Sequence, residues 1–248
     1  MSKRVKRNYP NLSRAPIIEA LIDIRVKFLE IPSTQVLDKL HDQISSDFPE
    51  KKARGISKFT IGNNEGLPHV SPEIAVNGYV CFSSDQKKAV QFRTDGFTFS
   101  FLKTYSSWEE IKPESEKYWK LYKLTTKPIS IERLAVRYIN SIKIPSPIND
   151  YSKYFKISSK LPENISGKVK QFLNMFVVSF DQGVQANVTL TSKPTEVPGF
   201  EEFLFDIDVF KDVNDQAIDM WAIFDYFKEV KNQIFFESIT KETERLFR

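Results

Sequence analysis

Residues 128–145 read P-I-S-I-E-R-L-A-V-R-Y-I-N-S-I-K-I-P, and this stretch decides the fold. It is rich in β-branched residues, contains no glycine, and has a proline at each end but none inside. Because proline cannot donate a hydrogen bond to a strand ladder, this distribution is typical of one long strand that ends at its prolines. We therefore predict a long strand through the middle of the chain, with room for a bulge.

A stretch near the start of the chain repeats this outline. Residues 16–32 read P-I-I-E-A-L-I-D-I-R-V-K-F-L-E-I-P. Both stretches open with Pro-Ile, contain a Glu, a Leu and an Arg in that order, and end with Ile-Pro. The matched pairs are Glu19 and Glu132, Leu21 and Leu134, and Arg25 and Arg137, so that residue 132 follows residue 19 by 113 positions and residue 137 follows residue 25 by 112. We interpret the two stretches as copies of a duplicated unit.

The remaining pattern predicts strands followed by helices in each half. In the first half we expect strands at 56–61, 79–84, 89–94 and 97–103, a long loop over 62–78, and helices after Ser33 and Ser107. In the second half we expect strands at 168–180, 184–191 and 203–210. A long helix capped by Asn214 or Asp215 then runs to about Phe236, and a short helix ends the chain.

Runs of strands followed by helices are typical of the α+β class. We predict two related halves, residues 15–127 and 128–248, each an antiparallel sheet packed with a long helix. They would share one aromatic core and form one globular unit.

The positive charge of the chain is concentrated at its start. The 248 residues carry 36 basic and 32 acidic side chains, a net charge of +4. Five of the basic residues, and no acidic one, fall within the first fourteen positions: Lys3, Arg4, Lys6, Arg7 and Arg14. The rest of the chain, with 31 basic and 32 acidic residues, therefore has a charge of −1. We predict a flexible basic tail over residues 1–14, which offers a route to nucleic-acid binding.

Composition narrows the cellular setting. No run approaches the ~20 apolar residues that a membrane helix needs, so we expect no membrane association. The single cysteine, Cys81, excludes an internal disulfide framework and favours the cytoplasm.

Arginines on the central strand form the first candidate site. Arg133 and Arg137 share one face of this strand, and Arg25 has a comparable position in the first copy. A concave basic surface built from them would suit an anionic ligand, with Tyr138 as an aromatic neighbour for stacking. In the alternative interpretation, acidic residues of the two copies neutralise the arginines; the candidates are Glu19, Asp23 and Glu132.

Two aspartates form the second candidate site. Asp206 and Asp208 are two residues apart on a predicted strand, so both project from one face. With Asp181 or Glu132 they would make an oxygen-rich Mg²⁺ site for a metal-dependent phosphoesterase or nuclease. Alternatively they form an ordinary solvent-exposed face opposite an apolar one.

Motifs for other chemistry are missing from the sequence. The chain has no glycine-rich phosphate loop, no C-x-x-C, no H-E-x-x-H and no G-x-S-x-G, and it has two histidines, His41 and His69. We therefore expect no cofactor, and we expect the protein not to be an enzyme.

Three segments together resemble a known family. They are residues 16–20 (P-I-I-E-A), 133–140 (R-L-A-V-R-Y-I-N) and 231–240 (K-N-Q-I-F-F-E-S-I-T). The chain is similar to a sporadically distributed, functionally uncharacterised prokaryotic family that opens with P-I-x-E-A and ends with a long helix followed by F-x-x-x-[IL]-T. The resemblance implies a prokaryotic cytoplasmic protein, with a patchy distribution that hints at defence or mobile elements. It brings no catalytic residues with it.

These observations lead to one expected function and one alternative. We expect a non-enzymatic binding or regulatory module that has a protein partner or associates with itself, because the duplicated strand and a Phe-rich helix offer an interface. The alternative is the metal-dependent hydrolase that would use Asp206 and Asp208.

Overall fold

The computed structural model describes residues 9–64, 67–103, 105, 107–157, 162, 164–167, 169–213 and 219–248, with the side chains of 56–64 and 67–74 outside the description. Within these residues the chain forms one nine-stranded antiparallel sheet of order β2-β3-β4-β5-β1-β6-β9-β8-β7. Its strands are β1 (Ile17–Lys27), β2 (Glu50–Asn64), β3 (Leu67–Phe82), β4 (Lys88–Arg93), β5 (Gly96–Leu102), β6 (Ser130–Pro145), β7 (Leu173–Ser179), β8 (Gln185–Lys193) and β9 (Phe200–Asp212). The helices are α1 (Thr34–Ile44), α2 (Trp108–Thr126), α3 (Met220–Ser238) and α4 (Lys241–Arg245), with short 3₁₀ turns at Tyr151–Lys153 and Asp181–Gly183.

The predicted central strand is confirmed as β6, which has 16 residues. It pairs with β1 on one side and with β9 on the other. A register irregularity between Arg25 and Val26 of β1, opposite Arg133 and Ile131, marks a bulge in the β1–β6 pair. Because β1 and β6 are neighbours, strands from both halves of the chain join into one continuous sheet.

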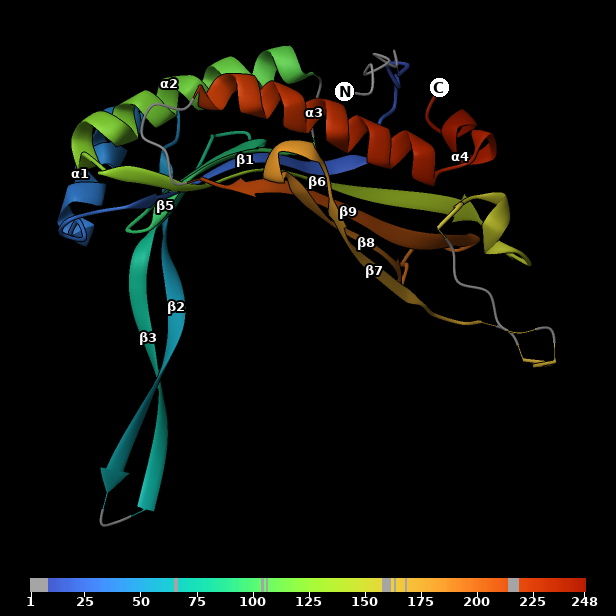
Figure 1. Ribbon diagram of the computed structural model, residues 1–248, viewed down its shortest axis with the longest axis horizontal. Coiled ribbons are helices and arrows are strands. Elements are labelled where there is room, and N and C mark those ends of the chain that lie inside the picture. Colours follow the sequence, from blue (N-terminus) through green and yellow to red (C-terminus); the bar gives the residue numbers. More distant parts are fainter. Residues whose placement is uncertain are drawn as a thin grey trace.

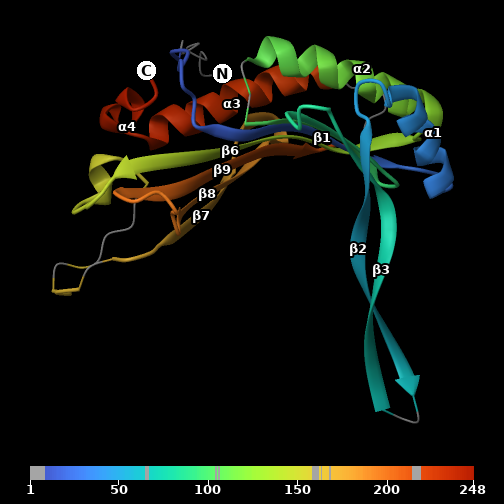
Figure 2. The ribbon, with the colours of Figure 1, turned by 180° about the vertical axis from the view of Figure 1, so that it is seen from behind.

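The long helices cover one face of this sheet and leave the other face open (Figure 1). Helix α3 packs on β6 and β9, and α2 packs on β5. Alternation along the strands explains this arrangement, since Ala20, Ile22 and Ile24 of β1 are fully buried while the residues between them are half-buried or exposed. The sheet curves beneath the helices, so its open face is concave (Figures 1 and 2).

Aromatic residues fill the space between sheet and helices. Phe97 of β5 contacts Trp119 and Tyr122 of α2, and Phe205 of β9 stacks on Phe235 of α3. These rings belong to a hydrophobic cluster that draws on both halves of the chain. The α+β class and the antiparallel sheet are therefore confirmed.

The loop predicted over residues 62–78 is wrong, because strands β2 and β3 continue through this region as a two-stranded hairpin. The hairpin projects away from the helices as an arm (Figures 1 and 2). Over most of its length β3 has β2 as its one neighbour, since its pairing with β4 covers only residues 78–82. A strand with one free edge tolerates proline, which explains how Pro68 and Pro72 fit inside it.

Helix α3 begins later than predicted. Its N-cap is Asp219, whose side chain accepts a hydrogen bond from the backbone N–H of Ala222 at 3.2 Å. The predicted caps Asn214 and Asp215 lie outside the described residues. In the described part of the chain, no helix is both long and apolar enough to cross a membrane.

Candidate functional site

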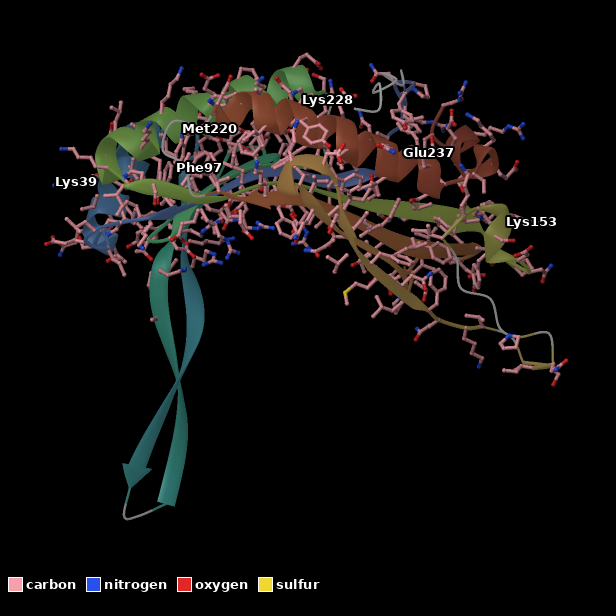
Figure 3. The ribbon with its side chains drawn as sticks, in the orientation of Figure 1. Lys39, Phe97, Lys153, Met220, Lys228 and Glu237 are labelled. Atoms are coloured by element: carbon pink, nitrogen blue, oxygen red, sulfur yellow. The ribbon has the colours of Figure 1, made fainter. Side chains whose placement is uncertain are left out.

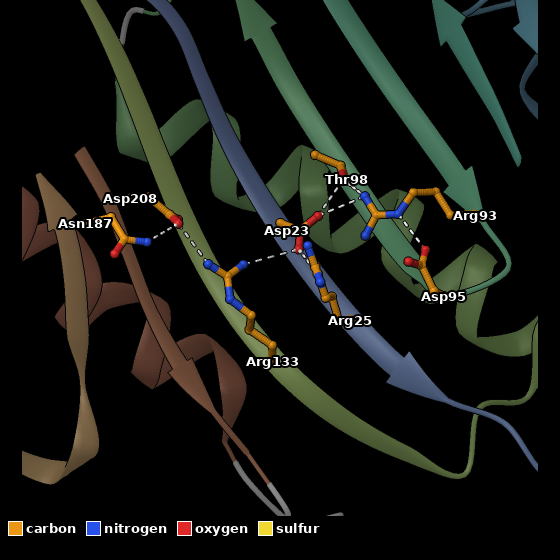
Figure 4. A network of polar contacts seen from close by, with 8 residues as sticks. All are labelled: Asp23, Arg25, Arg93, Asp95, Thr98, Arg133, Asn187 and Asp208. Carbon is orange, nitrogen blue, oxygen red and sulfur yellow. Dashed lines mark hydrogen bonds and ion pairs between the residues drawn. The ribbon is translucent and has the colours of Figure 1, made fainter. Parts of the chain in front are cut away.

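A chain of polar side chains crosses the open face of the sheet from strand to strand (Figure 4). It takes one residue from each of six neighbouring strands, in the order Arg93 (β4), Thr98 (β5), Asp23 (β1), Arg133 (β6), Asp208 (β9) and Asn187 (β8). We call these six residues the cross-strand network. It lies on the face that the helices leave open.

Asp23 connects the two halves of the cross-strand network. Its Oδ2 atom accepts hydrogen bonds from Arg93 Nη1 at 2.9 Å and from Thr98 Oγ1 at 2.7 Å. Its Oδ1 atom lies 3.7 Å from Arg133 Nη1. Burial by itself would lower the pKa of Arg93, but the charges of Asp23 and Asp95 outweigh burial, so this pKa is raised. Arg93 is therefore held charged inside the sheet.

Arg133 and Asp208 form the other half. Arg133 Nη2 donates to Asp208 Oδ2 at 2.8 Å, and both side chains are largely buried. Burial raises the pKa of Asp208, while Arg133 and Arg137 act to lower it. The guanidinium of Arg133 also lies over the ring of Phe210, 4.5 Å from its centre.

The neighbouring pair, Arg137 and Asp206, is more exposed to solvent. Arg137 Nε donates to Asp206 Oδ1 at 2.9 Å, and Arg137 Nη2 donates to Asp206 Oδ2 at 2.5 Å, so the ion pair is bidentate. This hydrogen bonding to Asp206 raises the pKa of Arg137.

The two candidate sites predicted from the sequence are thus one site. The register of β6 and β9 brings two arginines of the first candidate against the aspartates of the second, so that Arg133 pairs with Asp208 and Arg137 with Asp206. The alternative of neutralised arginines describes this geometry better than an open basic surface, although Asp206 and Asp208 are the main partners. Among the acids named from the sequence, Asp23 contributes, and Glu19 adds a charge interaction with Arg137.

The metal-site alternative lacks a third ligand in the described part of the chain. No group of three His, Cys, Asp or Glu side chains lies close enough there to hold a metal ion. Neither Asp181 nor Glu132 completes such a group.

The remaining nominated residues are placed as follows. Arg25 is exposed on the open face, with its Nε atom 3.8 Å from Asp23 Oδ1. Tyr138 is not an exposed stacking surface beside the arginines: it lies on the helix-covered face and is 1% exposed. The alternation of strand side chains explains the correction, because Tyr138 is one residue away from Arg137 and so points to the opposite face.

Part of the predicted basic tail is packed on the folded body. Tyr9 stacks on Phe236, with ring centres 4.9 Å apart, and Arg14 Nη2 donates to the backbone oxygen of Arg248 at 3.1 Å. Lys3, Arg4, Lys6 and Arg7 lie outside the described residues.

A cavity of about 570 Å³ lies on the helix side, away from the cross-strand network. It is bounded by the N-terminal segment 9–17, the start of α2, Asn140 of β6 and the middle of α3. Figure 3 labels Lys228 on the part of α3 that borders it. The N-terminal segment therefore closes one side of a space between the two long helices and the sheet.

Lys231 lines this cavity and is the residue that sequence reasoning missed. It is 8% exposed, and its Nζ atom lies 3.9 Å from the centre of the Tyr138 ring. Burial lowers the pKa of Lys231 to about 7, with a further lowering from Lys228 and an opposing effect of Glu229. The signal was present in the sequence, because Lys231 falls on the same helical face as Phe224, Phe227 and Phe235.

Two phenols, those of Tyr105 and Tyr9, extend the polar lining of the cavity. The hydroxyl of Tyr105 accepts a hydrogen bond from that of Tyr138 at 3.2 Å, and burial raises the pKa of Tyr105 to about 12. The hydroxyl of Tyr9 is buried and has no hydrogen-bond partner among the described residues. The cavity therefore combines aromatic walls with polar groups that have spare hydrogen-bonding capacity.

No protein-family model matches the chain, and no curated protein matches it significantly in sequence.

Proposed function

We propose that this protein is a non-enzymatic binding or regulatory module that associates with a second copy of itself through the edge strand β7. The observation that carries the proposal is the apolar, uncharged character of this edge. Leu173, Met175 and Val177 project from the open face of β7 and are 66%, 69% and 67% exposed. Phe176, on the other face, is also exposed.

A sheet edge without charged residues or prolines is unusual in a monomeric protein. β7 is the last strand of the sheet in the described part of the chain, and β8 is its one neighbouring strand there. Sheet edges usually carry charges or prolines that prevent pairing with another chain, whereas β7, with the sequence L-N-M-F-V-V-S, has neither. A second strand added at this edge would satisfy the backbone and cover the apolar side chains.

The opposite edge of the same sheet provides an internal comparison. Its outermost strand, β2, begins E-K-K-A-R and has a further lysine at position 58. Lysine-rich edges oppose strand pairing because the incoming strand would bury or approach these charges. One edge is therefore protected by charge and the other is not.

A second copy is the occupant that the composition of β7 favours. In a two-fold symmetric contact the same surface patch meets itself, so strands that carry like charges repel one another and uncharged apolar strands do not. Antiparallel pairing of β7 with β7 of the partner meets this condition.

The chemistry of the open face supports a binding rather than a catalytic role. Asp206 and Asp208, which the hydrolase alternative would need free for a metal ion, are paired with Arg137 and Arg133. The resemblance to a family without an established activity is compatible with this role. We place the protein in the cytoplasm because its single cysteine, Cys81, excludes an internal disulfide framework.

We also infer that residues 15–127 and 128–248 arose by internal duplication. In support, β5, β4 and β3 follow outward from β1 in the order in which β9, β8 and β7 follow from β6, while the outermost strand β2 has no counterpart. The offset of 112 relates Arg25 to Arg137, which share the open face. The offset of 113 relates Leu21 to Leu134, which lie on opposite faces, so we assign the duplication to the offset of 112.

Sedimentation velocity of the full chain tests the association. We expect a dimer that dissociates on dilution, and we expect Met175→Lys/Val177→Lys to be monomeric with an unchanged circular dichroism spectrum. Leu124→Lys is the matched control, because Leu124 is equally apolar and 74% exposed but lies on α2. A wild-type chain that stays monomeric at every concentration, or a dimer that survives the double substitution, would reject β7 as the interface.

A further inference from the structure

The cavity beside Lys231 has unsatisfied polar groups and belongs to neither the cross-strand network nor the β7 edge. We propose that it binds a small organic anion, whose carboxylate or phosphate group pairs with the side chain of Lys231 and whose apolar body lies against the aromatic walls. The proposal does not depend on association through β7.

The first argument is the missing counter-charge. Lys231 is more than nine-tenths buried, and among the described residues its Nζ atom has a ring contact with Tyr138 but no hydrogen bond or ion pair. An ammonium group removed from water without a counter-ion is costly, so buried lysines are usually paired. An anionic ligand would supply the partner that the described side chains do not.

The nearby carboxylates either pair with other side chains or make no contact with Lys231. Glu109 pairs with Lys228 at 3.4 Å, and Asp225 accepts hydrogen bonds from Trp108 Nε1 and Lys112 Nζ at 2.8 and 2.7 Å. Glu229 lines the cavity and favours a charged Lys231 without contacting it. The position opposite Lys231 is therefore left for a ligand.

The second argument comes from donors on the other walls. The hydroxyl of Tyr9 lines the cavity, is buried and lacks a hydrogen-bond partner among the described residues. Ser107 and Trp108, at the N-terminus of the 19-residue helix α2, line it as well. Hydrogen bonds from its own backbone N–H and from Ser107 lower the pKa of Glu109, so this helix end contributes the favourable direction of its dipole rather than free donors.

The walls determine the class of anion. A volume of about 570 Å³ is within the usual range of small-molecule sites and exceeds the size of an inorganic ion. Tyr9, Trp108 and Phe236 contribute aromatic surface to a lining that is otherwise mainly polar. This lining suits an anion with a single ring that rests on the aromatic side chains.

Thermal unfolding of the full chain with benzoate, phenyl phosphate, inorganic phosphate or sodium chloride at matched ionic strength tests the proposal. A ligand that binds the folded state alone raises the melting temperature. We expect a rise with benzoate or phenyl phosphate that clearly exceeds the effects of phosphate and chloride. A larger response to one of the two organic probes identifies the acidic group as carboxylate or phosphate.

Two variants locate the effect. Lys231→Met keeps the length and apolar stem of the side chain and should abolish the organic-anion response, whereas Lys120→Met, on the exposed surface of α2, should retain it. A response of equal size in Lys231→Met, or no response of the wild-type chain to either organic probe, would overturn the proposal.

Acetylation of the wild-type chain gives a second readout that needs no variant. With acetic anhydride and mass spectrometry, we expect benzoate or phenyl phosphate to slow modification of Lys231 several-fold while leaving Lys120 unchanged. Equal modification of Lys231 with and without these anions would also contradict the proposal.

Discussion

The Nζ atom of Lys231 lies 3.9 Å from the centre of the Tyr138 ring, on the side of the sheet that the helices cover. The ring face attracts a cation, but it replaces only part of the hydration that a buried ammonium loses. The pKa of Lys231 therefore falls to about 7, chiefly through burial. This single pair connects the central strand β6 to helix α3 and gives the fold a measurable dependence on pH.

Lys231→Met should change how stability depends on pH. An unfolded lysine has a pKa of about 10.4, so between pH 7 and that value the unfolded chain holds the extra proton. The free energy of unfolding should therefore rise with pH, with a contribution from this residue of about 1.4 kcal/mol per pH unit. The destabilisation caused by the buried ammonium group is greatest below pH 7 and disappears as the pH approaches the pKa of lysine in the unfolded chain.

Urea denaturation of wild type and Lys231→Met between pH 6 and 9.5 measures this contribution. We expect the variant to be the more stable near neutral pH and the difference to shrink as pH rises. The other titrating groups at the cavity, Glu109, Glu229, Tyr105 and Lys228, remain in both proteins, so the comparison isolates Lys231. Parallel stability curves would show that Lys231 has an ordinary pKa.

The two aspartates of β9 should differ in their effect on stability. Asp208→Ala removes the nearest carboxylate partner of Arg133, whose side chain is 19% exposed. Asp206→Ala removes the carboxylate partner of Arg137, whose side chain is 44% exposed. We expect a loss of about 2 kcal/mol for the first change and below about 1 kcal/mol for the second, because water can replace the partner of the more exposed arginine.

Chemical denaturation of both variants tests this difference. Adding Arg133→Met to Asp208→Ala should recover part of the lost free energy of unfolding, because the charge of Arg133 that has lost its partner is removed as well. Equal losses for the two aspartates, or no recovery in the double variant, would show that the pairing with Arg133 does not control stability.

Removal of residues 1–8 tests the nucleic-acid expectation without disturbing the packed residues Tyr9 and Arg14. The truncation removes Lys3, Arg4, Lys6 and Arg7 from a chain whose net charge is +4. Any non-specific binding to duplex DNA should weaken, and the slope of log affinity against log salt should become shallower by up to about 0.9 for each lost contact.

Fluorescence anisotropy with a labelled duplex across a salt series gives both quantities. A variant with an unchanged salt slope would move the nucleic-acid contact from the tail to the folded body, where Arg25 and Arg137 are exposed on the open face.

Local pattern was sufficient for most of the strands. The β-branched run between Pro128 and Pro145 specifies β6, and the alternation in residues 17–27 specifies β1, because side chains on a strand point alternately to its two faces. The same reasoning failed for residues 62–78. Glycine and proline are unfavourable in a strand that has neighbours on both sides, so they predicted a loop here. The arm formed by β2 and β3 has free edges that tolerate them, and only the strand pairing shows that these edges are free.

The sequence by itself determined the α+β class, the central strand and the shared face of Asp206 and Asp208, since each of these depends on periodicities within one segment. The tertiary structure alone decided which residues meet. Arg133 pairs with Asp208 across 75 positions of the chain, and Lys231 reaches Tyr138 across 93, from position 138 to position 231. Such contacts depend on strand order and helix placement. The charge of a side chain can be read from its residue type, but whether that charge is neutralised, solvated or left without a partner depends on what the fold places beside it.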